Sequence, residues 1–207
     1  GRSHTHRLLR NPRAQVTGFA EVAKVRTDHT KALIEKHYGQ NTPGKDWKGL
    51  TITTDYRELL ADKQVDALLI ATPDHWHGEP TILAARAKKH IYCEKPISLT
   101  IKEGRAMVEA VNENKVVFQT GSQQRTEYGG KFRKTVELIR SGAIGELKKI
   151  RVCVGGPPKP CDLPTEKVPE GIDWDAWLGP APARGLAAPR AAAARTLRFS
   201  GLNHSIC

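Results

Sequence analysis

Short apolar runs alternate with amphipathic stretches along most of this chain, and this alternation restricts its fold more than any other feature. The apolar runs have the length and β-branched content of strands, and the amphipathic stretches repeat apolar residues at helical spacing. A strand recurs about every 25 residues with a helix in between, a pattern typical of parallel strands joined by right-handed crossovers. We predict an α/β fold with a doubly wound parallel sheet, with strands at 14–22, 65–72, 90–93, 115–120 and 147–154 and helices at 4–11, 27–38, 55–62, 77–89, 100–114 and 128–141. We expect the second of these helices to stop at Gly39.

The composition and charge argue against two classes of partner. No run of eighteen apolar residues occurs, so the sequence predicts no membrane span. The formal net charge is +11, but basic and acidic residues are interleaved until residues 183–207, which hold four arginines and no acid. Without a zinc finger, a basic helix or an aromatic RNA-binding motif, this charge does not indicate nucleic-acid binding. We expect neither nucleic acid nor membrane among the partners.

The spacing of cysteines and histidines gives no sign of a metal site. The four cysteines lie far apart and form no C-x-x-C pair, which argues against both structural zinc and a disulfide framework. His75 and His77 stand two residues apart, but no third ligand follows at a suitable spacing. We predict no metal and interpret the cysteines as reduced thiols.

The residues that follow each predicted strand bear most directly on function, because ligands of open α/β sheets bind at the carboxyl ends of the strands. Glu21 lies at the end of the first predicted strand. A carboxylate there in a dinucleotide-binding fold accepts hydrogen bonds from the adenosine ribose and repels a 2′-phosphate. That favours NAD, although Lys24 and Arg26 close behind would suit NADP. Taken alone, Glu21 also fits a solvated turn.

Polar residues follow the next three predicted strands as well. A threonine–proline stop precedes Asp74 and His77, and Lys95 stands between a carboxylate and a proline. Such a lysine can donate to a substrate hydroxyl or a cofactor ribose, whereas an isolated Glu-Lys-Pro is also typical of a surface ion pair. Residues 121–126 carry a row of hydrogen-bonding side chains, which suits a recognition loop or a plain solvated one.

Four segments, in this order, resemble the Gfo/Idh/MocA family of oxidoreductases: ATPDHWHGEP (71–80), IYCEKPIS (91–98), QTGSQQR (119–125) and PEGIDWDAWLGPAP (169–182). The resemblance covers roughly residues 1–182, and the ordered series is more specific than any single motif. It implies a Rossmann domain for NAD(P), followed by a second α/β domain whose open sheet covers the substrate.

The resemblance also implies roles for individual residues. Lys95 matches the family's catalytic lysine, which faces the nicotinamide and the reacting sugar carbon. Gln123 and Arg125 fall in the loop that approaches the nicotinamide end of the cofactor. The other cofactor-site residues of the family carry over onto Glu21, Thr72, Pro73, Asp74, His77 and Glu94.

The match to the family is incomplete at both ends. The family's glycine-rich phosphate loop follows a first strand, but here only its last glycine has a counterpart, Gly1, which runs into a helix. We therefore expect a sheet that lacks its first strand. We assign residues 1–146 to the dinucleotide-binding domain, 147–182 to the start of the substrate domain, and 183–207 to an atypical tail that a shifted reading frame would explain.

These inferences predict an enzyme that transfers a hydride between NAD, or NADP, and a carbinol carbon of a sugar, cyclitol or related polyol. One alternative is an NAD-dependent glycosidase that acts by transient oxidation and elimination. Another is a noncatalytic, truncated nucleotide-binding module. We expect these 207 residues alone to lack measurable dehydrogenase activity and to bind NAD weakly or not at all. For the intact protein we expect a homo-oligomer in the cytoplasm, with twin-arginine export as the alternative location.

Overall fold

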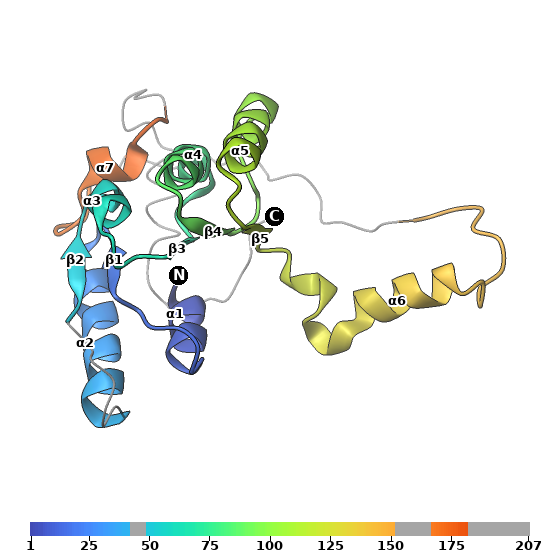
Figure 1. The fold of residues 1–207 in the computed structure, drawn as a ribbon, viewed down its shortest axis with the longest axis horizontal. Coiled ribbons are helices and arrows are strands. Elements are labelled where there is room, and N and C mark those ends of the chain that lie inside the picture. The colour runs from blue at the N-terminus through green and yellow to red at the C-terminus, as the bar shows by residue number, and fades with distance from the viewer. Residues whose placement is uncertain (42–48, 152–166, 182–207) are drawn as a thin grey trace.

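Five short strands alternate with helices in the described part of the chain, which is residues 1–41, 49–151 and 167–181 of a computed structural model (Figure 1). The strands are β1 (Gly18–Ala20), β2 (Thr51–Thr53), β3 (Ala67–Ile70), β4 (His90–Cys93) and β5 (Phe118–Thr120). The α-helices are α1 (Arg2–Leu9), α2 (Lys24–Asn41), α3 (Tyr56–Ala61), α4 (Gly78–Arg86), α5 (Ile101–Asn114), α6 (Lys131–Arg140) and α7 (Trp174–Leu178). Three short 3₁₀ turns are η1 (Asp74–Trp76), η2 (Gln123–Arg125) and η3 (Tyr128–Gly130).

The three strand pairs in the described part of the chain are parallel, which confirms the predicted α/β architecture. β1 pairs with β2, so that Gly18 lies beside Thr51. β4 lies between β3 and β5, with Ala67 beside His90 at one end of the β3–β4 pair. Among the described strands none pairs with both β1 and β3, so the sheet consists of two groups. The strand that we expect before Gly1 falls outside the given sequence and stays a prediction.

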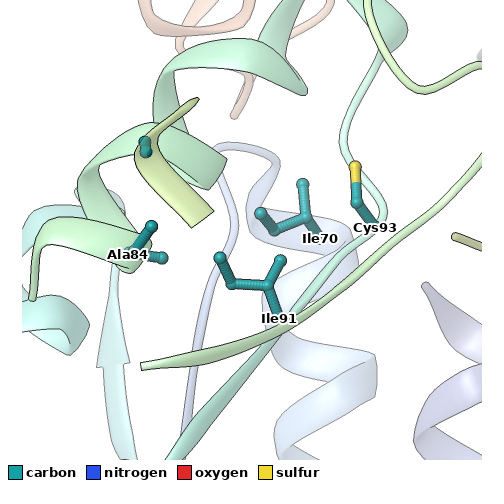
Figure 2. Close-up of a cluster of buried hydrophobic side chains, with 6 residues drawn as sticks. Ile70, Ala84, Ile91 and Cys93 are labelled. Carbon is teal, nitrogen blue, oxygen red and sulfur yellow. The ribbon is translucent and has the colours of Figure 1, made fainter. Parts of the chain in front are cut away.

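The main core lies where β3 and β4 pack against α4 and α5. Ile91 and Cys93 are two residues apart and therefore face the same side of β4, where they cluster with Ile70 of β3 and Ala84 of α4 (Figure 2). All four of these residues are at most 4 % exposed. Because the side chain of alanine is small, α4 can pack closely against the sheet.

Side-chain caps fix where two of the helices begin. The Thr100 hydroxyl accepts from the backbone N–H of Glu103 at 3.2 Å, and the Glu103 carboxylate accepts from the backbone N–H of Thr100 at 3.0 Å. Asp55 caps α3 in a similar way by accepting from the backbone N–H of Arg57 at 2.9 Å. A cap of this kind stabilises a helix by about 1 kcal/mol. The predictions at 55–62 and 100–114 are confirmed at these two starts.

In the first third of the chain one strand was missed and the end of one helix was predicted wrongly. The strand β2 was not predicted, because it is only three residues long and only Thr53 in it is buried. Helix α2 does not stop at Gly39 but continues to Asn41. Glycine weakens a helix interior by about 1 kcal/mol but does not end it unless the backbone turns, and Gly39 keeps helical geometry. The sequence also predicts a turn-rich segment over residues 39–49, of which 42–48 lie outside the described residues.

The strands predicted at 65–72 and 115–120 are shorter in the structure, as β3 (Ala67–Ile70) and β5 (Phe118–Thr120), and two other predicted strands differ more. The first was expected to be buried along 14–22, but β1 covers three residues and each is only partly buried. The last was expected at 147–154, but residues 147–151 form no strand, and 152–154 lie outside the described part. Leu147 and Ile150 are 47 % and 69 % exposed. A strand needs a partner for its backbone groups, and among the described residues none pairs with this segment.

The thiol of Cys93 provides a test of the core packing. Cys93 is fully buried, and this burial raises the pKa of its thiol from 9.0 to about 11. Because the unfolded chain ionises this thiol at lower pH than the folded chain does, the free energy of unfolding falls as pH rises from 9 to 11. We expect the wild-type protein to lose stability relative to Cys93→Ala across that interval in urea melts. A stability difference that does not change with pH would contradict the burial of this thiol.

Candidate functional site

A carboxylate at the end of β4 joins the polar side chains at this edge of the sheet. Glu94 follows Cys93 directly, and its side chain is 16 % exposed. Its Oε1 lies 2.5 Å from His4 Nε2 and accepts a hydrogen bond from Gln123 Nε2 at 2.6 Å. Its Oε2 accepts from the backbone N–H of Lys95 at 3.1 Å. Both oxygens are therefore hydrogen-bonded, and Glu94 connects α1 with the loops that follow β4 and β5.

The backbone ladder of the sheet explains why these loops meet. The ladder continues past the strand ends, since the N–H of Glu94 donates to the carbonyl of Ile70 at 2.9 Å and that of Gly121 donates to Cys93 at 2.7 Å. Gly121 and Glu94 are thereby brought together. A Cβ at position 121 would lie 2.7 Å from Glu94 Oε2 and 2.9 Å from Glu94 Cα. Only glycine fits at this position beside the carboxylate.

Lys95 has a side chain that is half-buried and not held by the protein. No hydrogen bond or ion pair within the described residues engages its ammonium, because the neighbouring Glu94 carboxylate is taken up by His4 and Gln123. The peptide bond from Lys95 to Pro96 is cis. An ammonium in this position can donate a hydrogen bond to a ligand hydroxyl or exchange a proton with it.

His77 links the loops that follow β3 and β4. Its ring is buried, with 1 % of the residue exposed. Nδ1 lies 2.5 Å from the carbonyl oxygen of Pro96, and Nε2 lies 3.0 Å from that of Thr72. With both nitrogens facing backbone carbonyls, the ring can reach a ligand only by giving up one of these contacts. The structure therefore favours a positioning role for His77. The direct cofactor contact that the family resemblance implies for this residue stays a prediction.

Glu21 stands at the carboxyl end of β1 in a fixed backbone setting. Its N–H donates to the carbonyl of Thr53 at 3.0 Å, so the residue extends the β1–β2 ladder. Its carboxylate accepts from the backbone N–H of Ala23 at 3.0 Å and lies 4.0 Å from the Arg26 guanidinium. The side chain is 25 % exposed. A carboxylate held in this way retains lone pairs for the hydroxyl groups of a ligand.

The first turn of α1 lies at the same edge as the end of β4, because His4 in that turn contacts Glu94. Gly1 caps the helix without a side-chain hydrogen bond, and the first turn holds no acidic residue. The first N–H groups of a helix have no partner inside the helix. A helix start of this kind suits an anionic group such as a phosphate.

The remaining predicted residues lie in the loops after β3 and β5. Thr72 and Asp74 are exposed around Pro73, and the Asp74 carboxylate accepts from the backbone N–H of His75 at 2.9 Å. Arg125 ends η2, but its side chain is outside the described part of the structure. The structure therefore joins Glu94 and Gln123 directly, and His77 links the loops of Thr72 and Pro96, while Glu21 stands in the β1–β2 group.

Sequence reasoning missed the contribution of α1. His4 contacts Glu94, and Arg7, one turn later, forms an ion pair with Glu127 in the loop after β5. The Arg7 guanidinium lowers the pKa of the Glu127 carboxyl. The only sequence signal was their spacing of three residues, which places both side chains on one face of a helix. Nothing in the sequence indicated what that face would meet.

The described residues contain no group of three His, Cys, Asp or Glu side chains able to hold a metal ion. None of their helices is both long enough and apolar enough to cross a membrane.

Residues 1–122 match the family model described as an oxidoreductase family with an NAD-binding Rossmann fold, which covers more than half of the chain. The chain belongs to the Gfo/Idh/MocA oxidoreductase family. An uncharacterized oxidoreductase of Bacillus subtilis, YrbE, is 29% identical over 77% of this chain and 42% of its own length. A myo-inositol 2-dehydrogenase of Thermotoga maritima is 36% identical over 52% of this chain and 32% of its own. A 2,7-anhydro-N-acetylneuraminate hydratase of Escherichia coli is 40% identical over 43% and 23%.

Solved structures agree with the fold. A probable dehydrogenase from Thermotoga maritima superposes with a TM-score of 0.55 at 27% identity, covering 69% of this chain and 38% of that one. The scyllo-inositol dehydrogenase of Lactobacillus casei has a TM-score of 0.59 at 20% identity over 70% and 39%, a likeness that supports the Rossmann-like fold alone. The chain spans about two fifths, or less, of the length of these relatives.

The close approach of Gly121 to Glu94 predicts a selective loss of stability. We expect Gly121→Ala to lower the free energy of unfolding by about 1–3 kcal/mol, because the new Cβ overlaps the Glu94 backbone and carboxylate. Gly39→Ala is the matched control, since a Cβ there meets nothing within 4 Å inside a helix. That control should be neutral or stabilising by about 0.5–1 kcal/mol. Equal effects of the two substitutions in urea melts would refute the assigned contact.

Proposed function

We propose that this chain forms the cofactor-binding half of an NAD(P)-dependent oxidoreductase that moves a hydride to or from a carbinol carbon of a sugar, cyclitol or related polyol. One observation carries the proposal. The Lys95 ammonium is left unpaired at a strand end, beside a Glu94 carboxylate that other donors already occupy. Family membership and relatives that are named as inositol dehydrogenases support it.

The residues at the strand ends fit a dinucleotide. The α1 start, with Gly1 as its cap, offers free N–H groups and no acid to repel a pyrophosphate. Glu21 would hold the adenosine ribose, and the exposed loop of Thr72, Pro73 and Asp74 would form the neighbouring wall. When such a cofactor is bound, its nicotinamide ring supplies the hydride acceptor or donor.

Lys95 would act on the substrate hydroxyl. Its ammonium donates a hydrogen bond that orients the hydroxyl, and in its neutral form the amine takes the proton from that oxygen as the carbinol is oxidised. Glu94 would fix the direction of the lysine through the Lys95 backbone N–H. Gln123 restrains Glu94, and we place it with Arg125 near the nicotinamide end.

A second candidate function is that of an NAD-dependent glycosidase that acts by transient oxidation and elimination. Relatives that are not named as dehydrogenases favour it. Two relatives are named as 2,7-anhydro-N-acetylneuraminate hydratases. The two candidates differ in their products. A glycoside releases its aglycone without net formation of NADH in the second case, whereas NADH accumulates with turnover in the first.

The assembly and location of the whole protein remain predictions. We propose a homo-oligomer that acts on a small-molecule sugar or polyol in the cytoplasm, without nucleic-acid or membrane partners. The domain division at residues 146 and 182 is likewise proposed.

The role of Lys95 is tested by Lys95→Met in the whole enzyme. We expect kcat for polyol oxidation to fall by about 10²–10⁴-fold, the usual loss on removing a general acid–base group. NADH affinity, measured by fluorescence titration, should hardly change, because the adenosine-side residues are untouched. Lys102→Met, on the surface of α5, is the control. Unchanged turnover in Lys95→Met would remove the basis of the proposed mechanism.

The role of Glu21 is tested by cofactor preference. We expect Glu21→Gln to weaken NAD binding by about ten- to a hundredfold, the equivalent of one lost hydrogen bond to a charged group. Binding of NADP should improve relative to NAD, because the 2′-phosphate no longer meets a carboxylate. Glu113→Gln, on the exposed side of α5, removes the same charge elsewhere. The same change in preference in both variants would indicate an effect of net charge instead.

A further inference from the structure

A segment far along the chain returns to the carboxyl ends of the strands. We call residues 171–179 the tryptophan strap; it contains α7 and lies near α3 in Figure 1. At one end it is joined to the loop after β1. The backbone N–H of Lys24 donates to the carbonyl of Gly171 at 2.8 Å, and that of Asp173 donates to Val22 at 3.1 Å. Ile172 forms an isolated antiparallel bridge with Ala23 between these two bonds.

The other end of the tryptophan strap is joined to the loop after β3. His75 Nε2 lies 2.9 Å from the carbonyl oxygen of Trp177. The Trp76 indole N–H donates to two strap carbonyls, Ala176 at 3.1 Å and Trp177 at 3.0 Å. The rings of His75 and Trp177 meet edge to face. The ring of Trp174 stacks on that of Trp177, with 4.8 Å between the ring centroids. One short segment thus holds the loops after two strands of different sheet groups.

The contact between the tryptophan strap and Trp76 requires a glycine. A Cβ on Gly179 would lie 1.9 Å from Cζ2 of the Trp76 indole, closer than any real contact. Gly179 also has a positive φ of 47°. A side chain at this position would push the strap away from the loop after β3.

The location of the tryptophan strap determines what it can influence. The two loops that it joins are those that begin with Glu21 and with Thr72, to which we assign the adenosine half of the cofactor. The strap contacts given above reach neither Glu94 nor Lys95. The loop after β3 is also linked to Pro96 through His77, so we expect the larger part of the effect of the strap, but not all of it, on the adenosine half of the proposed cofactor site.

We propose that the tryptophan strap positions the walls of the adenosine subsite, and so sets the affinity for the nucleotide without taking part in hydride transfer. This inference rests on the proposed function. Without the strap, the link between the loops after β1 and β3 would run through α3, where the Tyr56 hydroxyl donates to Glu79 of α4 at 2.8 Å and the Tyr56 ring meets Trp76 edge to face. No described strand pairs with both groups. Binding of an adenosine nucleotide would then have to bring the two loops together, at a cost in affinity.

The test compares two glycine variants of the unmodified chain. Gly179→Ala places a Cβ into the Trp76 ring, whereas Gly145→Ala is a matched control with a similar positive φ, 73°, and nothing within 4 Å of its Cβ. We expect Gly179→Ala to raise the dissociation constant for ADP-ribose by about 5- to 150-fold, the usual range of coupling between sites. The constant for nicotinamide mononucleotide should change by a smaller factor. In the whole enzyme the same variant should raise KM for NAD by a larger factor than it lowers kcat.

Two further measurements test the inference even if Gly179→Ala fails to fold. Trp76→Phe keeps an aromatic ring but removes both hydrogen bonds to the strap, so it should weaken ADP-ribose in the same direction. In the unmodified chain, ADP-ribose should slow hydrogen exchange at the strap amides, since coupling between two sites is reciprocal. Nicotinamide mononucleotide should leave hydrogen exchange at these amides unchanged.

Equal losses for ADP-ribose and nicotinamide mononucleotide would overturn the inference, because they would indicate general damage. Equal losses in Gly179→Ala and Gly145→Ala would overturn it as well. If the strap variants bind ADP-ribose as tightly as the wild-type chain does, the proposed role of the strap is refuted while the proposed cofactor site still stands. If the unmodified chain binds neither ligand, the same variants are compared in the whole enzyme, and absence of binding there would refute the proposed cofactor site and the inference with it.

Discussion

The hydrogen-bond ladder of β3, β4 and β5 extends one residue beyond the last residue of β4, and the candidate site depends on this extension. Glu94 and Gly121 remain in register there, each donating its N–H to the neighbouring strand. The register brings the two residues within contact distance, and it fixes the backbone on which Lys95 stands. The core under this edge, in which Cys93 and Ile70 pack against α4, keeps the strand ends from shifting. Chemistry at the edge therefore depends on apolar packing below it.

The hydrogen-bond partners of Glu94 and Lys95 differ: the carboxylate is bonded within the protein, whereas the ammonium has no partner among the described residues. Glu94 is hydrogen-bonded on both oxygens, by His4, Gln123 and the chain itself. An adjacent lysine would ordinarily form an ion pair with such a carboxylate, and at an exposed position that pair would contribute little. Here the carboxylate is already occupied, so the lysine keeps its charge available for a ligand. His77 links the two neighbouring loops by contacting the backbone carbonyls of Thr72 and Pro96.

Periodicity predicted the βα order and the limits of β4, α3 and α5 well, because those elements carry strong signals: an apolar run or a capping residue. It failed where local signals were weak or absent. The three residues of β2 bury only Thr53, so their pattern was too short to recognise. Residues 147–151 have the composition of a strand, but a strand forms only where another strand pairs with it. In the site, the strand-end rule located Glu21, Glu94 and Lys95, whereas the contact of His4 with Glu94 joins residues 90 positions apart and left no trace in the sequence.

The return of the tryptophan strap also bears on how the chain reaches its folded state. The unit from β3 to β5 is built from neighbouring segments, so its contacts close only short loops. The bond between Trp76 and Trp177 joins residues 101 positions apart, and closing a longer loop costs more chain entropy, about 0.6 kcal/mol for each doubling of its length. A single hydrogen bond contributes only about 1 kcal/mol net, so no one bond of the strap offsets the entropy cost of closing this loop. Its bonds therefore act as a set, and we expect the strap to form only after the sheet edge that receives it.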